Sequence, residues 1–310
     1  MVSINPFMTW RAIAAATCKG VSQVLFIENT MTGILILLAI TVSSPLLGMV
    51  ALLSSLIGTL IGLAGKADTQ LIQQGLLGYS PVLTGIALTL FLTGPYHWII
   101  GLFGAAVTAL FTATVMHFMR QTEIPVLTFP FIIVSWITLL ASYRLDIIQL
   151  SSELVPQDLS RWDLHIEGNV SGMQAMLNGI GQIFFLQNSI SGVLLYAGLF
   201  WAGWRFGVFA IVGNVFAVLT AFVLLAEHSL IQAGLYGYNA ILTILAVSVV
   251  FKDSSNRLAV VTGILGACIA VPLTAAVTTL LMPYGLPAFT MPFVLSTWLL
   301  LGVRKVFPRF

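Results

Sequence analysis

Two glutamines, Gln23 and Gln182, occupy matching positions in two similar segments 159 residues apart. A side-chain amide both donates and accepts hydrogen bonds without carrying a charge. These amides could therefore bind a permeant on either side of a central pore. Alternatively, each could cap a re-entrant helix or bond a neighbouring helix. Thr128 and Thr290 each lie two residues before a proline, and they too allow two interpretations. Their hydroxyls, and the carbonyls that the proline leaves without a donor, could face the same path. Alternatively, each threonine could hydrogen-bond the backbone of its own kinked helix.

These residues belong to an internal repeat. Three pairs of segments are similar, and in the second pair six of ten positions are identical. The first two pairs share one offset of 159 residues and the third has an offset of 162, which needs only a three-residue insertion in the second half. A repeated offset indicates duplication. The pairs are 20–33 with 179–192, 75–84 with 234–243, and 125–136 with 287–298.

The elements that must hold these residues lie in a membrane. The chain has 310 residues, of which 59% are hydrophobic and only 7% charged, and its mean hydropathy is +1.04. A soluble domain carries about a quarter of its residues as charged side chains. The length accommodates roughly ten spans of about 20 residues each. A net charge of +2 without a basic cluster excludes nucleic-acid binding.

We predict three regions: a first repeat over 1–143, an extracytoplasmic polar linker over 144–167 and a second repeat over 168–310. Each repeat begins with a short Gly-flanked segment that we interpret as a re-entrant, half-membrane helix. Five apolar segments follow in each repeat, and an odd number gives inverted repeats. The re-entrant segments are about 7–29 and 168–187. The spans are 31–43, 45–65, 76–93, 97–119 and 126–143, then 190–201, 204–226, 235–251, 258–282 and 287–303.

The distribution of charged residues supports an orientation with both termini in the cytoplasm. With both termini cytoplasmic, ten of the twelve basic residues lie on the cytoplasmic side, as the positive-inside rule favours. The linker is net negative, which suits an external segment. Its five acids are Asp146, Glu153, Asp158, Asp163 and Glu167. The start of the chain, Met1 to Trp10, lacks the pattern of a secretory signal, and we expect the first helices to act as the insertion signal.

Aromatic and branched side chains accompany the polar ones. Tyrosine and leucine are four residues apart in both repeats and so share one helix face, which is either a packing surface or an apolar wall of the path. A phenylalanine follows each of the two glutamines. These residues are Tyr79 with Leu83, Tyr238 with Leu242, and Phe26 and Phe185. We expect Asn29 and Asn188 to fix the re-entrant turn rather than to touch a permeant.

The chain lacks the residues that other functions need. No acidic residue is placed securely within a span, so a proton relay or sodium site is not indicated. The histidines read as loop or interfacial residues and the two cysteines as packing residues, so we predict no metal and no cofactor. These residues are His97, His117, His165 and His228, with Cys18 and Cys268. Catalytic motifs and phosphate loops are absent too, so the chain does not read as an enzyme. A neutral polar solute moving down its gradient fits best; a coupled transporter and a non-transporting scaffold are the alternatives.

Taken together, these motifs resemble the urea transporter family over nearly the whole chain. The resemblance rests on the segments that carry Gln23 and Gln182, on Gly-Leu-x-Gly-Tyr in both halves, and on Pro-x-x-Thr-x-Pro-Phe in both halves. The first half departs from the family pattern, because it reads Tyr79-Ser80-Pro81 where the second half has the more familiar Tyr238-Asn239-Ala240.

The resemblance implies an all-α integral membrane protein with about ten transmembrane helices in two inverted five-helix repeats, each with a half-membrane helix. It further implies a homotrimer in a bacterial inner membrane, with one pore per protomer at the repeat interface. Urea would be the permeant of this channel-type facilitator, with ammonia or short amides as other candidates. Gln23 and Gln182 would serve the outer and inner binding regions, and Thr128 and Thr290 the midpoint constriction. The slot would be formed by Phe26, Phe185, Tyr79, Tyr238, Leu83 and Leu242.

Overall fold

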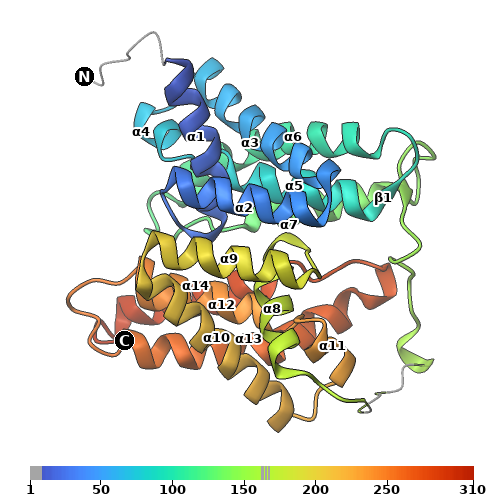
Figure 1. The fold of residues 1–310 in the computed structure, drawn as a ribbon, viewed down its shortest axis with the longest axis vertical. Coiled ribbons are helices and arrows are strands. Elements are labelled where there is room, and N and C mark those ends of the chain that lie inside the picture. The colour runs from blue at the N-terminus through green and yellow to red at the C-terminus, as the bar shows by residue number, and fades with distance from the viewer. Residues whose placement is uncertain (1–8, 162–163, 165, 167) are drawn as a thin grey trace. The chain divides into compact units, whose positions relative to one another are not determined.

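The structure is a computed structural model that describes residues 9–161, 164, 166 and 168–310. The predictions that concern residues 1–8, His165, Asp163 and Glu167 lie outside the described residues. The chain forms two compact units, Met1–Leu154 and Val155–Phe310. Each unit is helical and is described by itself (Figure 1).

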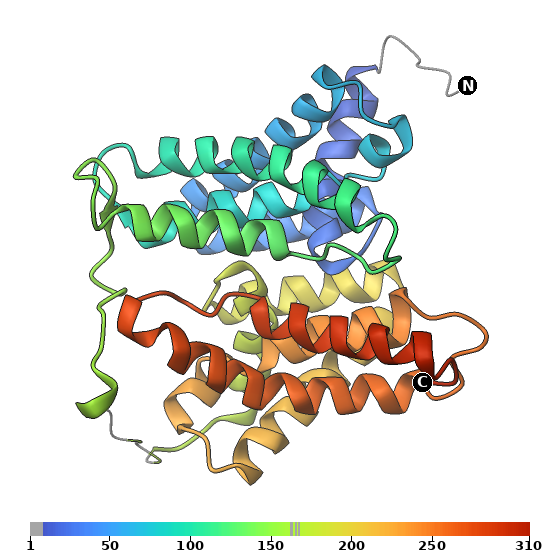
Figure 2. The ribbon, with the colours of Figure 1, turned by 180° about the vertical axis from the view of Figure 1, so that it is seen from behind.

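The first unit consists of apolar helices joined by short turns. Its helices pack closely, and Figure 2 shows α6 and α7 side by side. The elements are α1 (Trp10–Ser22), η1 (Gln23–Leu25), α2 (Thr30–Ser43), α3 (Pro45–Ala64), α4 (Thr69–Gln73), α5 (Tyr79–Phe91), β1 (Leu92–Thr93), α6 (His97–Met119), α7 (Phe129–Ala141) and β2 (Gln149–Leu150).

The second unit has the same order of helices. It differs in a π-helical turn, η4, and in two additional 3-10 turns, η2 and η5. The elements are η2 (Leu159–Arg161), α8 (Gly172–Gly181), η3 (Gln182–Phe184), α9 (Ser189–Ala202), α10 (Trp204–Val223), α11 (His228–Gln232), α12 (Gly237–Leu245), η4 (Ala246–Val250), α13 (Ala259–Leu281), η5 (Met282–Tyr284) and α14 (Met291–Val306).

The helix bounds follow the offsets found in the sequence. Adding 159 to the bounds of α2, α3 and α4 gives the bounds of α9, α10 and α11, and adding 162 to those of α6 gives α13. The short helices α4 and α11, which the hydropathy pattern did not predict, also correspond. The helices of both halves therefore begin and end at equivalent positions of the repeated sequence.

Each repeat opens with two helices that meet at a sharp bend. The bend is 75° between Trp10–Leu25 and Thr30–Ser43, and 76° between Gly172–Phe184 and Ser189–Ala202. Asn29 caps the second helix of the first pair, because its Oδ1 accepts a hydrogen bond from Thr32 N at 3.0 Å, and Asn188 does the same for α9. Both asparagines therefore fix the start of the helix that follows the bend. That the bend is re-entrant and that neither asparagine touches a permeant stay predictions.

A single buried helix forms the centre of each unit. Residues 79–89 of α5 and 237–248 of α12 and η4 are all buried, and their neighbours pack around them on several sides. A helix that is apolar on every face can be stable only when it is surrounded by other elements. These central helices carry the predicted Tyr and Leu positions, so the site lies at the core of each unit.

The lengths of the helices support a membrane protein but not a count of ten spans. Within the described part of the chain, four helices are long and apolar enough to cross a membrane, or up to six spans if each bent pair is one. The shorter apolar helices are Tyr79–Phe91, Phe129–Ala141 and Gly237–Val250. Thirteen residues of α5 extend only about 20 Å at 1.5 Å per residue. Ten spans therefore stay a prediction.

Three predicted boundaries were wrong for local reasons. The predicted span 76–93 is longer than α5, because residues 75–78 form turns and β1 leaves the helix to pair with β2. The spans predicted over 126–143 and 287–303 begin later, at Phe129 and Met291, because each helix is preceded by a left-handed residue. Within the interval 144–167 the structure describes the short elements β2 and η2, and the division of the chain there stays a prediction.

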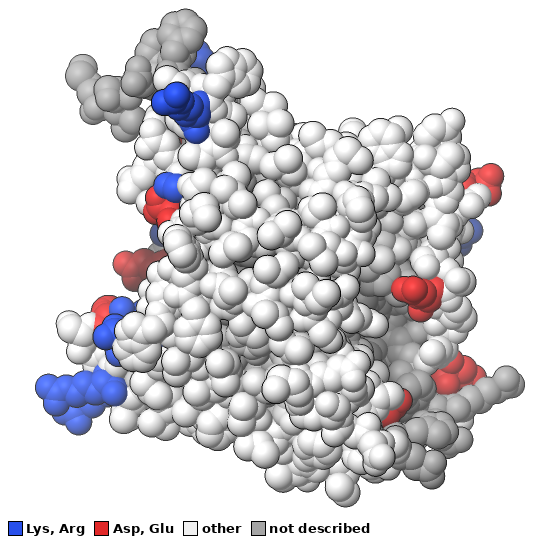
Figure 3. All heavy atoms as spheres, in the orientation of Figure 1, with Lys and Arg blue, Asp and Glu red and all other residues white. Residues whose placement is uncertain are grey.

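The surface fits a lipid environment. On the face drawn in Figure 3, the charged side chains lie near the margins of each unit and the area between them carries none. Large apolar side chains on the long helices are exposed, including Phe103 at 71% and Leu110 at 60% on α6. In water such a surface would be unfavourable, so these helices face the bilayer.

Glycine allows the turn before each central helix to pack closely. Gly75 and Gly234 have φ of +77° and +78°, a conformation in which a side chain is strained. A Cβ on either residue would also collide with backbone atoms of α1 or α8, at Gly20 or Gly179. Each turn can therefore approach the bent helix pair that opens its repeat only without a side chain.

We expect Gly234→Ala to lower the free energy of unfolding by about 1 to 3 kcal/mol or more, because strain and collision add. Thermal unfolding in detergent would measure the change, and Gly75→Ala should behave alike. Gly302→Ala is the matched control, since a Cβ there meets nothing within 4 Å and the residue lies inside α14. A Gly234→Ala protein as stable as wild type would contradict this account of the turn.

Candidate functional site

The two predicted glutamines are held by equivalent hydrogen bonds. Gln23 Nε2 donates to the carbonyl of Gln74 at 2.9 Å, and Gln182 Nε2 donates to the carbonyl of Ala233 at 3.1 Å. Gln74 and Ala233 end the short helices α4 and α11, where backbone carbonyls lack helical partners. Each amide therefore hydrogen-bonds the C-terminal end of a short helix. This agrees with the alternative interpretation given above, in which each glutamine bonds a neighbouring helix.

This anchoring also fixes which way each amide points. Only the NH₂ group can pair with a carbonyl oxygen, so the assignment of nitrogen and oxygen is forced. Within the described residues, Oε1 of Gln23 and Oε1 of Gln182 accept no hydrogen bond. Gln23 is half-buried and Gln182 is 8% exposed. Each repeat thus holds one neutral acceptor oxygen in a fixed position, which a small N–H donor could use.

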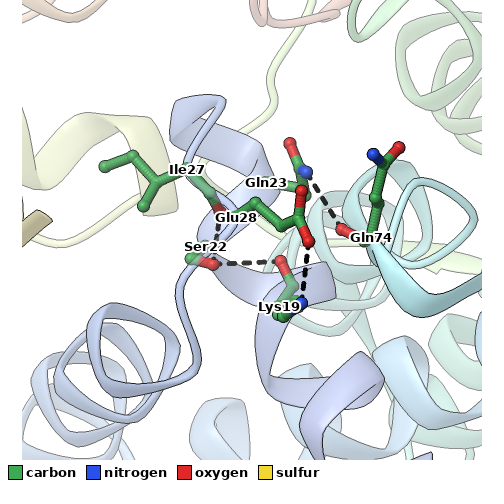
Figure 4. Close-up of polar contacts among 6 residues, drawn as sticks. All are labelled: Lys19, Ser22, Gln23, Ile27, Glu28 and Gln74. Atoms are coloured by element: carbon green, nitrogen blue, oxygen red, sulfur yellow. Dashed lines mark hydrogen bonds and ion pairs between the residues drawn. The ribbon is translucent and has the colours of Figure 1, made fainter.

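Figure 4 shows the bend that carries Gln23. Ser22 Oγ closes it with hydrogen bonds to the carbonyl of Ile27 at 2.6 Å and to that of Lys19 at 3.1 Å. Lys19 Nζ also forms an ion pair with Glu28 Oε1 at 2.8 Å. The equivalent positions 159 residues later are Asn178 and Gln187, so the second bend carries no such charge.

Among the non-glycine residues with left-handed backbone, two in each unit lie beside predicted site residues. Phe26 and Phe185 have φ of 62° and 60°, and Leu127 and Phe289 have φ of 53° and 49°. For bulky residues this conformation is an outlier that persists only where surrounding structure enforces it. The first pair ends η1 and η3 beside the glutamines, and the second pair directly precedes Thr128 and Thr290.

The tyrosines of the central helices hold the second pair. Tyr79 Oη donates to the carbonyl of Leu127 at 2.7 Å, and Tyr238 Oη donates to that of Phe289 at 2.5 Å. Both tyrosines are 7% exposed, and both threonines 2%. Each tyrosine hydroxyl therefore fixes the backbone immediately before a predicted constriction residue.

The structure brings most predicted residues of one unit together. In the second unit, the ring of Phe185 meets that of Phe289 edge to face, with centroids 5.8 Å apart, so that Phe185, Tyr238 and Thr290 all converge on one segment. In the first unit, η1 contacts α5, whose Tyr79 reaches Leu127. Leu83 and Leu242 lie one turn further along α5 and α12 and are fully buried.

Sequence reasoning missed several participants. The carbonyls of Gln74 and Ala233 carry no side-chain signal, and only their place in the repeat could have pointed to them. Leu127 and Phe289 differ in type, so their shared left-handed backbone is not visible in the motif. Asn239 was noted as part of the repeat, but its hydrogen bonds to α13 and α14 were not expected.

Comparison with known proteins decides the family. A family model described as urea transporter matches residues 14–305. This chain belongs to the urea transporter family. The match covers both units and every predicted site residue, and it makes the chain a membrane transport protein rather than an enzyme.

Individual relatives support the same family. Urea transporter 1 of Ovis aries is 26% identical over 300 residues, which cover 91% of this chain and 75% of that protein. Urea transporter 1 of Rattus norvegicus is 26% identical over 315 residues, which cover 95% of this chain and 76% of that protein. The resemblance inferred from the repeated motifs is therefore confirmed.

We expect Tyr238→Phe to reduce the free energy of unfolding by about 1 to 3 kcal/mol, because the buried carbonyl of Phe289 would lose its donor. Thermal unfolding in detergent measures the loss, and Tyr79→Phe should show a similar one. Tyr96→Phe is the control, since Tyr96 is 54% exposed, and it should change stability by less than about 0.5 kcal/mol. Equal effects at Tyr96 and Tyr238 would refute the role of the buried hydroxyl.

Proposed function

We propose that this urea transporter is a passive channel whose path is lined by the matched residues of both repeats. The observation that carries the proposal is the pair of anchored glutamines, each of which leaves one uncharged acceptor oxygen in a partly buried position. Urea has four N–H hydrogens and one carbonyl, so it needs acceptors above all.

The chemistry of dehydration explains why acceptors matter. Moving an amide-like group from water into hydrocarbon without hydrogen bonds costs about 4 to 8 kcal/mol. Gln23 Oε1 and Gln182 Oε1 would replace water as acceptors at two stations, and Thr128 and Thr290 would supply further ones. Each station offers one or two hydrogen bonds, worth about 1 kcal/mol net each. Such weak binding at several sites lets the permeant leave again.

The remaining site residues would select the permeant by its shape. Phe26 and Phe185 carry rings beside the glutamines, and the left-handed backbone directs them away from the ordinary helical course. With Tyr79, Tyr238, Leu83 and Leu242 they would form apolar walls that admit a flat molecule. Ions gain little there, because the walls are uncharged and dehydrating an ion costs far more than dehydrating an amide.

The proposal extends to the organisation in the membrane. The matched helix bounds of α2 to α4 and α9 to α11 support two repeats, and the two bends support half-membrane helices. We accordingly favour about ten spans in two inverted five-helix repeats, 1–143 and 168–310, with an external linker and cytoplasmic termini. A homotrimer in a bacterial inner membrane follows from the family resemblance alone.

We expect the reconstituted protein to speed urea equilibration well above that of empty liposomes. Gln23→Leu and Gln182→Leu should each reduce urea permeability about twofold to tenfold, because each removes one acceptor from the path. Stopped-flow light scattering measures the rates. Gln157→Leu is the matched control, because this glutamine is exposed before the second re-entrant segment, and its variant should keep the wild-type rate.

The same vesicles separate the alternatives. A passive channel gives a rate that is independent of imposed pH or sodium gradients, whereas uphill accumulation under either gradient would revive the coupled transporter. Wild-type protein that passes no urea would refute the proposed function. Comparison with thiourea, ammonia and water would define which small neutral solutes share the path.

We expect the external linker and the cytoplasmic loops to label differently in intact cells. In a background of Cys18→Ala and Cys268→Ala, Glu153→Cys should react with a membrane-impermeant maleimide, and Lys252→Cys should react only after permeabilisation. Both positions are exposed. The opposite pattern would reverse the orientation, and labelling of both in intact cells would contradict the inverted arrangement.

A further inference from the structure

The central helix of the second unit ends in the π-helical turn η4. The backbone N–H of Phe251 donates to the carbonyl of Ala246 at 2.9 Å, five residues back. In an α-helix it would bind the carbonyl of Val247, four residues back. The π-turn therefore takes the usual α-helical donor away from the carbonyl of Val247. Such turns are rare, and they often occur at functional sites.

Arg304 of α14 binds this carbonyl instead. Its Nη2 donates to the carbonyl of Val247 at 2.6 Å, and its Nη1 donates to that of Phe251 at 2.7 Å. Nη2 also lies 3.5 Å from Thr262 Oγ1. Arg304 is 8% exposed, and a buried charge is costly unless it is hydrogen-bonded. A planar guanidinium can bind two carbonyls at once, and a cation is favoured at the C-terminal end of a helix. The arginine thus caps the π-turn.

The first repeat ends its central helix in α-helical register. Leu92 is the equivalent of Phe251 at the offset of 159, and its N–H donates to the carbonyl of Leu88, four residues back. At the offset of 162, Ser142 is the equivalent of Arg304, and its Oγ donates to a carbonyl of its own helix α7. The offset grows from 159 to 162 between the central helix and α13, which is where η4 lies. The arginine and the π-turn thus occur in the same repeat.

The helix that carries Arg304 also holds the rest of the central helix. At its start, Tyr238 Oη donates to the carbonyl of Phe289, which directly precedes α14. In its middle, Thr243 Oγ1 and Ser296 Oγ of α14 lie 2.8 Å apart and share a hydrogen bond. Arg304 completes this series at the end. The position of the central helix is therefore set along its whole length by one neighbouring segment.

The loop that follows η4 is held as well. Asn256 Nδ2 donates to the carbonyl of Pro308 at 2.8 Å, and the N–H of Leu258 donates to that of Arg309 at 2.8 Å. Ser248 Oγ, within η4, donates to the carbonyl of Ala259 at 2.8 Å. Because this loop is tied down, a change of register in η4 is passed to α12.

We propose that Arg304 is a positioning residue that keeps η4 in its π register and so holds Leu242 in place in the path. The proposal rests on the proposed function, because it assumes that Leu242 forms a wall. Leu242 lies four residues before η4, which is about one helical turn. Without Arg304, the N–H of Phe251 can return to the carbonyl of Val247. A register change of one residue moves a helix by about 1.5 Å along its axis and turns it by about 100°.

The test uses the full-length protein in liposomes, with urea and N-methylurea as probes. In Arg304→Met we expect the ratio of methylurea to urea permeability to rise by about threefold or more, because a methyl group is discriminated by tenfold or more only in a tight site. This ratio does not depend on the fraction of protein that is folded. Arg304→Lys should raise it less, since an ammonium keeps the charge but lacks the fork. Arg309→Met is the matched control, because it removes a charge from an exposed side chain, and it should leave the ratio unchanged.

Deletion of Val249 provides a rescue. It makes Phe251 the fourth residue after Ala246, so that the same hydrogen bond becomes α-helical and the carbonyl of Val247 regains a backbone donor. In this background Arg304→Met should change the permeability ratio much less than in the full-length chain, since the two changes act on one interaction.

A further measurement does not depend on transport. Arg304→Met should speed hydrogen–deuterium exchange in residues 246–252 several-fold, and deletion of Val249 should reverse this. An unchanged permeability ratio in folded Arg304→Met protein would overturn the proposal, as would an equal rise in Arg309→Met or an undiminished effect of Arg304→Met in the deletion background. Absence of any urea flux in wild type would instead contradict the proposed function, and the exchange data would still decide whether Arg304 holds the π-turn.

Discussion

The fold depends on satisfying backbone polar groups where a helix is interrupted inside a membrane. Lipid offers no hydrogen bonds, so every break exposes carbonyls and N–H groups that protein atoms must bind. In this chain the breaks are served by a few side chains on neighbouring elements. Tyr79 and Tyr238 bind the carbonyls before the two threonines, and Gln23 and Gln182 bind the carbonyls that end two short helices.

This constraint links stability to transport. The tyrosines and glutamines that bind these carbonyls are neutral. Charged groups lie at other breaks: Lys19 and Glu28 form an ion pair at the first bend, and Arg304 binds carbonyls at the end of η4. A neutral amide oxygen binds an N–H donor without the high cost of desolvating a charge. Under the proposed function, the same side chains that satisfy the broken backbone would offer uncharged acceptor atoms to urea.

Much of this could be predicted from the sequence, because the repeat makes the polar positions visible against an apolar background. Gln23, Tyr79 and Thr128 recur at fixed offsets, and the bounds of α6 were predicted to the residue. The left-handed backbone of Leu127 could not be predicted, since a non-glycine residue adopts it only when tertiary contacts enforce it. The anchoring carbonyls also escape prediction, because a backbone carbonyl is the same at every position.

The differences between the repeats are as informative as the matches. Duplication gives both halves the same helices, the same bends and the same tyrosine tie, which are the features that the membrane enforces. Other matched positions diverge: Lys19 and Glu28 correspond to Asn178 and Gln187, and Ser80 corresponds to Asn239, whose Oδ1 accepts a hydrogen bond from the N–H of Phe293. The duplicated scaffold therefore keeps the ties that the broken backbone needs, while side chains at other matched positions change their charge or their hydrogen-bond partners.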